Sequence, residues 1–156
     1  MDSRLTARFA AETRRAGAAL AARLRPGDVV LLTGQLGAGK SEFARGVAQG
    51  LGVAVPVTSP TFTLLNVYDT ALGPLHHFDW YRVRDEEEIP AAGLDEYVGG
   101  EAVTLIEWHE RAPDLVPADH VEVVLIPLED GARLIDLLPR GALAASGRFE
   151  GITLNA

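Results

Sequence analysis

The chain has 156 residues, of which 47% are hydrophobic and 23% charged, a balance typical of folded globular proteins and unlike that of disordered chains. Its 14 basic and 22 acidic residues give a formal net charge of −8, so we do not expect this chain alone to bind nucleic acid stably. The absence of cysteine excludes disulfides, thiolate metal sites and cysteine nucleophiles.

The N-terminal segment predicts a surface helix. Phe9, Ala16, Leu20 and Leu24 recur at helical spacing, which indicates an amphipathic helix over about 9–24. The arginines near the N-terminus resemble a transit peptide only superficially, because acidic residues lie among them and no apolar core follows. No apolar run approaches the roughly 18 residues of a membrane-spanning helix, so we expect a cytoplasmic protein without a membrane segment.

Apolar strands and helices alternate along the rest of the chain. The predicted strands are 29–32, 62–68, 75–80, 103–106, 121–126, 134–138 and a weak last one at 149–154; a helix is predicted over 41–50 and a short one near 93–97. This alternation predicts an α/β fold with a mainly parallel sheet, helices on both of its faces and antiparallel strands at an edge. We expect residues 1–156 to form a single domain whose tail, from about residue 141, is weakly defined.

A glycine-rich segment follows the strand predicted at 29–32. Residues 34–41 read Gly-Gln-Leu-Gly-Ala-Gly-Lys-Ser and match the phosphate-loop pattern G-x-x-x-x-G-K-[ST] at every position. Glycines let successive N–H groups turn inward around a phosphate, and the helix that follows adds its positive N-terminal end. The residues expected to contact the phosphates are Gly34, Leu36, Gly37, Ala38, Gly39 and Lys40. The hydroxyl of Ser41 is expected to ligate Mg²⁺.

Hydrolysis also needs an acid that holds the metal at a strand end beside the loop. Glu107 directly follows the strand 103–106, and Asp79 lies near the end of the strand 75–80. Together with Lys40 they are the candidate catalytic residues. Trp108 stands next to Glu107 and is expected either to lie against the nucleotide or to belong to the core.

Other patterns limit the chemistry. His76 and His77 are adjacent on a predicted strand and so point to opposite faces, which argues against a joint metal site. No N-K-x-D segment that reads guanine is present, which favours adenine. No arginine-rich lid is evident either, so transfer of the phosphoryl group to water is favoured over transfer to a metabolite.

Further motifs match a known family. In chain order they are Gly-Gln-Leu-Gly-Ala-Gly-Lys-Ser at 34–41, Thr-Ser-Pro-Thr-Phe-Thr at 58–63, His-Phe-Asp-Trp-Tyr-Arg at 77–82, Gly-Leu-Asp-Glu-Tyr at 93–97 and Leu-Ile-Glu-Trp at 105–108. Over roughly 9–138 the chain resembles the TsaE (YjeE) family, the small ATPase of bacterial tRNA threonylcarbamoyladenosine biosynthesis.

The resemblance implies ATP hydrolysis with Mg²⁺ in a complex with the TsaD and TsaB proteins, which modifies adenosine 37 of tRNAs reading codons that begin with A. It implies that the segment 58–63 acts as a switch-like loop. The implied metal ligands are Ser41, Glu107 and Asp79, and the implied nucleotide contacts beyond the phosphate loop are Trp108, Thr13 and Arg133.

The chain departs from the family pattern at two positions of the loop. Gln35 stands where the family usually has an acidic residue, and Ser41 where it usually has threonine. Ser41 keeps the hydroxyl that the metal needs, whereas Gln35 removes a negative charge beside the phosphates. A small metabolite kinase and a nucleotide-gated binding module with negligible turnover remain the alternative functions.

Overall fold

A single seven-stranded sheet organises the part of the chain that the computed structural model describes, residues 2–154. Its strands lie in the order β1-β7-β6-β2-β5-β4-β3. The bounds are β1 Ser3–Ala7, β2 Val29–Thr33, β3 Leu65–Thr70, β4 Gly73–Asp79, β5 Val103–Glu107, β6 His120–Pro127 and β7 Arg133–Arg140. The four central strands β6, β2, β5 and β4 run parallel, and the pairs at both edges are antiparallel.

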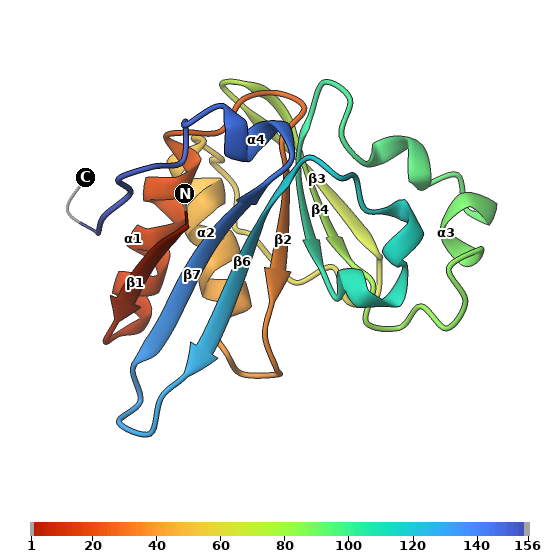
Figure 1. Cartoon of the computed structure of the whole chain (residues 1–156). Coiled ribbons are helices and arrows are strands. Elements are labelled where there is room, and N and C mark those ends of the chain that lie inside the picture. Colours follow the sequence, from red (N-terminus) through yellow and green to blue (C-terminus); the bar gives the residue numbers. More distant parts are fainter. Residues whose placement is uncertain (1, 155–156) are drawn as a thin grey trace.

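Helices and turns cover both faces of the sheet (Figure 1). The long helices α1 (Ala10–Ala21) and α2 (Lys40–Gly50) pack on one face, with buried side chains such as Leu20 and Phe43. The other face carries only short elements: α3 (Glu88–Ala91) and the 3₁₀ turns η1 (Asp95–Tyr97), η2 (His109–Arg111) and η3 (Pro113–Leu115). The predicted fold class is confirmed. Within residues 2–154 no helix is long and apolar enough to cross a membrane.

The N-terminal arginines are not all helical, contrary to the prediction. Arg4 lies in β1, which pairs with β7 and directs Leu5 and Ala7 into the core. The sequence does not predict this strand because it has only two inward apolar residues, Leu5 and Ala7, and alanine is small. Phe9 also departs from the predicted apolar stripe, since it precedes α1 and is 71% exposed.

The predicted strand 149–154 is wrong. After β7 the chain forms the one-turn helix α4 (Ala142–Ala145) and then a series of turns. Phe149 and Ile152 are buried against the core without joining the sheet. The guanidinium of Arg148 fastens the tail through two bonds, of 2.9 and 3.0 Å, to the carboxylate of Asp28. Tertiary contacts therefore hold this segment where strand pairing was expected.

The hairpin is present, but its first strand begins later than predicted. β3 starts at Leu65 and not at residue 62, and Asp69 and Thr70 extend it past the predicted boundary. Phe62 is 80% exposed, and Leu64 has a positive φ of 66°, a backbone conformation that a strand does not accept. The residues before Leu65 form a loop, and this loop reaches the functional cleft described below.

Helices α1 and α2 approach each other closely through two glycines. A Cβ atom on Gly17 would lie 2.3 Å from the carbonyl oxygen of Phe43, and one on Gly46 would lie 2.0 Å from the carbonyl oxygen of Arg14. Both obstacles are backbone atoms, which cannot rotate away. Because α2 carries the phosphate-loop lysine and serine, this contact fixes their height above the sheet.

Substituting Gly46 with alanine should separate the two helices and destabilise the fold. We expect Gly46→Ala to lower the free energy of unfolding by about 2 kcal/mol, the cost of overpacking a tight interface. Urea denaturation followed by circular dichroism measures the change. Gln49→Ala, on the exposed side of the same helix, is the control and should stay within about 0.5 kcal/mol of the parent. An unchanged midpoint for Gly46→Ala would contradict the tight packing.

Candidate functional site

The carboxyl ends of the parallel strands bring the predicted site residues to one edge of the sheet. β2 leads into the phosphate loop, and Leu32 near its end pairs with Glu107 of β5. Glu107 in turn pairs with Asp79 of β4. Ligands of open α/β sheets bind beyond this edge. Two acids separated by about 28 residues of sequence therefore become neighbours on adjacent strands.

The phosphate loop has the backbone that its glycines predict. Gly37 and Gly39 have φ angles of 80° and 105°, which residues with a side chain rarely adopt. Arg133 of β7 donates from Nε to the carbonyl oxygen of Ala38 at 2.9 Å and from Nη2 to that of Gly37 at 3.2 Å. These bonds fasten the loop to β7. The N–H of Ala38 already donates to the carbonyl oxygen of Gln35, so an anion at the start of α2 would be bound by other N–H groups of the loop and of the helix.

A cleft of about 400 Å³ opens over the phosphate loop. It is lined by Leu36, Gly37, Gly39, Lys40, Ser41, Glu42, Ser59, Thr61, Asp79, Tyr81, Glu107, Trp108 and Arg133. Most of the predicted site residues meet there. Gly34 and Ala38 do not line it: Ala38 is fully buried, and a Cβ on Gly34 would lie 2.9 Å from the carbonyl oxygen of Leu125. Their part is to shape the loop.

Thr13 lies outside this cleft. Its side chain is buried and lines an adjoining hollow of about 140 Å³ together with Arg8, Phe9, Glu42 and Arg133. Gly39, Glu42 and Arg133 line both spaces, so the hollow continues the cleft past the phosphate loop toward β1 and α1.

Lys40 and Trp108 face each other across the cleft. The Lys40 ammonium lies 3.9 Å from the centre of the Trp108 ring, within range of a cation–π attraction. Trp108 has a positive φ of 59°, which is not a strand conformation, so β5 ends at Glu107. Burial lowers the pKa of the Lys40 ammonium below its ordinary value. The nearby carboxylates of Glu107, Glu110 and Asp79 attract its charge and oppose this shift.

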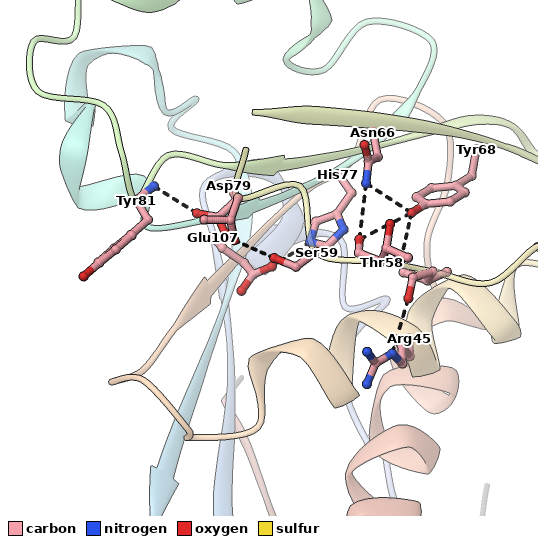
Figure 2. Close-up of polar contacts among 11 residues, drawn as sticks. Arg45, Thr58, Ser59, Asn66, Tyr68, His77, Asp79, Tyr81 and Glu107 are labelled. Atoms are coloured by element: carbon pink, nitrogen blue, oxygen red, sulfur yellow. Dashed lines mark hydrogen bonds and ion pairs between the residues drawn. The ribbon is translucent and has the colours of Figure 1, made fainter. Parts of the chain in front are cut away.

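The two acids of the cleft are held in different ways (Figure 2). Asp79 accepts one bond of 3.0 Å from the hydroxyl of Thr61 and another of 2.9 Å from the backbone N–H of Tyr81. Glu107 lies with Oε2 2.7 Å from Nε2 of His77, and both side chains are buried. One acid is thus bound to a loop, and the other to a neighbouring strand.

The loop 58–63 is fastened to the hairpin that follows it, as Figure 2 shows. The backbone N–H of Thr58 donates to the hydroxyl of Tyr68 at 3.2 Å, and the side-chain amide of Asn66 donates to the carbonyl oxygen of Thr58 at 3.2 Å. Within the loop, Ser59 and Thr61 share a hydroxyl bond of 2.7 Å. The link from this loop to Asp79 consists of the hydroxyl groups of Ser59 and Thr61, whose bonds rearrange readily.

Three residues of the site had no role in the sequence-based prediction. Tyr81 packs its ring 4.9 Å from that of Trp108, and His77 supports Glu107. Both belong to the motif at 77–82, which was the available signal. Glu42 directly follows Ser41 and lies 2.6 Å from each of Arg14 and Arg45. These arginines lower the pKa of the Glu42 carboxyl, with the hydrogen bond from Arg14 as the largest cause. The spacing of Glu42 and Arg45, three residues apart in a predicted helix, was an available signal for their pairing. No pattern in the sequence pairs Glu42 with Arg14.

The donor set of the cleft fits a hard cation together with an anion. A hydroxyl and two carboxylates offer the oxygen ligands that Mg²⁺ prefers. Within residues 2–154 no group of three or more histidine, cysteine or acidic side chains is placed to hold a metal ion by itself. A divalent cation at Ser41, Asp79 and Glu107 would thus depend on ligands from a bound phosphate, which is how Mg²⁺ usually binds with nucleotides.

Comparisons with known proteins agree with this geometry. The family model described as "Threonylcarbamoyl adenosine biosynthesis protein TsaE" matches residues 7–135. A protein of Treponema pallidum named tRNA threonylcarbamoyladenosine biosynthesis protein TsaE is 43% identical over 132 residues, which cover 85% of this chain and 97% of that protein. A protein of Bacillus subtilis with the same name is 42% identical over 124 residues, or 80% of this chain and 77% of the relative.

A solved structure agrees as well. The crystal structure of YdiB from Bacillus subtilis superposes with a TM-score of 0.76 at 34% identity, covering 91% of this chain and 88% of that one. The family match spans the phosphate loop, the loop 58–63 and both acids of the cleft, as well as Arg133. This chain therefore belongs to the TsaE family.

Proposed function

We propose that the protein is a Mg²⁺-dependent ATPase that serves threonylcarbamoyladenosine formation in tRNA. The convergence of Lys40, Ser41, Asp79 and Glu107 in one cleft is the observation that carries the proposal. A phosphate loop alone supports nucleotide binding, whereas two buried acids beside it supply what hydrolysis needs. We also propose that the whole chain acts as one ATPase domain, which the single continuous sheet supports.

Each residue of the cleft has a defined task in this proposal. The Lys40 ammonium would move from the Trp108 ring to the β- and γ-phosphates. The negative charge of the phosphates would then offset the free-energy cost of burying the ammonium. Ser41, Asp79 and Glu107 would hold Mg²⁺, which neutralises charge on the transferred phosphoryl group. Tyr81 packs against Trp108, whose ring lies beside the Lys40 ammonium.

The hollow beside Thr13 is proposed to take the base and sugar of the nucleotide. It adjoins the phosphate loop at Gly39 and Arg133, and exposed Phe9 at its rim offers a ring for stacking. The absence of an N-K-x-D segment favours adenine over guanine. Glu42 lines both the hollow and the cleft. Its carboxylate forms ion pairs with Arg14 and Arg45, which would reduce its repulsion of the phosphates.

The relatives are named for tRNA threonylcarbamoyladenosine biosynthesis, and this role is proposed here for the chain in the cytoplasm. Its net charge of −8 argues that it acts through protein partners and does not hold the tRNA itself. The TsaD and TsaB proteins are the proposed partners, with hydrolysis as the step that resets their assembly. Gln35 is exposed at the loop, so we propose that an acidic side chain at this position is not needed to shape the phosphate cradle.

Removing the lysine or the acid should abolish hydrolysis. We expect phosphate release from ATP to be slow for the protein alone and faster with TsaD and TsaB present. Lys40→Ala and Glu107→Ala should each lower the stimulated rate by at least about 100-fold, the usual cost of losing a group that stabilises transition-state charge. Glu101→Gln, an exposed acid at the opposite end of β5, is the matched control and should keep the parental rate.

The same assay separates the alternative functions. Formation of ADP that occurs only when a metabolite acceptor is added, without release of free phosphate because the phosphoryl group passes to the acceptor, would assign a kinase. Nucleotide binding without any phosphate release, even with both partners, would assign a nucleotide-gated binding module and overturn the ATPase proposal.

Trp108 should report nucleotide binding by its fluorescence. The chain has two tryptophans, and Trp80 is fully buried against Phe78 and does not line the cleft. When ATP draws the Lys40 ammonium off the Trp108 ring, the emission of Trp108 should change. Titration with ATP should therefore alter the emission of the parent, and Trp108→Phe should lose the response while calorimetry still detects binding. A response that survives Trp108→Phe would refute the proposed contact.

A further inference from the structure

The buried histidine beside Glu107 is not explained by packing alone. His77 lies on β4, two residues before Asp79, and its side chain is almost fully buried on the face that carries α2. Its Nε2 is 2.7 Å from Oε2 of Glu107. Burying an imidazole costs free energy that an aliphatic side chain at this position would not incur. The bond to Glu107 is the compensation.

The protonation of this pair follows from the task of Glu107. As a metal ligand Glu107 is an ionised carboxylate, which accepts hydrogen bonds and donates none. Nε2 of His77 must then carry the hydrogen and donate it. The second ring nitrogen, Nδ1, is buried and finds no hydrogen-bond partner among residues 2–154. Within this part of the chain, the imidazole ring thus makes its hydrogen bond to Glu107 alone (Figure 2).

We propose that His77 is the positioning residue of Glu107. Its N–H holds Oε2, so the carboxylate keeps one rotamer and leaves Oε1 to Mg²⁺. This inference rests on the proposed function, because it assigns Glu107 to the metal. Groups that hydrogen-bond to metal-ligating side chains orient them, and their loss typically lowers metal affinity about 10–100-fold.

The support of Glu107 differs in kind from that of Asp79. Asp79 is bonded through Thr61 to the loop 58–63, whereas His77 and Glu107 stand on the paired strands β4 and β5. A rearrangement of the loop would release Thr61 from Asp79 and leave the bond between His77 and Glu107 intact. His77 therefore holds Glu107 by a bond between two strands of the sheet, although its side chain also adjoins Thr58 and Ser59 of the loop.

Two substitutions at His77 separate its hydrogen bond from its packing. Glutamine places an N–H close to the position of Nε2, while asparagine is too short to reach Glu107. The probe is ADP, whose affinity is measured by calorimetry with Mg²⁺ and again in EDTA. We expect the Mg²⁺-dependent gain in affinity to fall about 10–100-fold in His77→Asn and to be largely kept in His77→Gln. Affinity in EDTA should match the parent in both variants.

His76→Gln is the matched control. His76 is the preceding residue on the same strand, points to the opposite face and bonds to the carbonyl oxygen of Tyr97, so its substitution should leave the Mg²⁺-dependent gain unchanged. Thermal denaturation shows which variants fold. If His77→Asn does not fold, His77→Gln decides: retention of the gain supports the inference, and loss of the gain in a folded protein overturns it.

The outcomes distinguish this inference from the proposed function. If the parent protein binds no ADP or shows no gain with Mg²⁺, the proposed function fails. A parent with a clear gain and a folded His77→Asn variant with the same gain would show that the proposed function stands and that His77 does not position Glu107.

Discussion

The parallel pairing of β2, β5 and β4 is the constraint on which the cleft depends. Because of this pairing, the three strands end at the same edge of the sheet, and Glu107 of β5 lies beside Asp79 of β4. On its other side β5 pairs with β2, which leads into the phosphate loop. A shift of register by one residue would turn Glu107 to the opposite face of the sheet, because side chains alternate along a strand. The apolar residues of β5, which are buried on both faces, make such a shift costly.

The cleft contains three charged side chains that are buried, although burial disfavours charged groups. Lys40, Asp79 and Glu107 are all buried, and their partners are an aromatic ring, a hydroxyl with a backbone N–H, and a histidine. None of these is a full opposite charge bonded directly to the group. Such an arrangement leaves the lysine and the acids ready for charged ligands, since a phosphate and a cation would complete both sets.

Rigid and rearrangeable parts meet at this site. The close contact of Gly17 and Gly46 locks α2 against α1, and Arg133 locks the phosphate loop against β7. The loop 58–63, in contrast, is held by hydroxyl and amide groups with considerable exposure. Its attachment to Asp79 through Thr61 couples one of the two acids to the loop, whereas the side chain of Glu107 is bonded to His77 of the neighbouring strand.

The sequence alone determined the phosphate loop, the apolar strands and both acids, because these depend on local patterns: glycine spacing, buried runs and strand ends. It also identified the family from motifs in their order. Tertiary structure alone decided that Ser3–Ala7 joins β7, that the tail packs without pairing, and that Phe62 belongs to a loop. Local propensity is weak in these segments, so distant partners determined their conformation. The pairing of His77 with Glu107, which are 30 residues apart in the chain, likewise required the register of two strands, which no pattern within either strand contains.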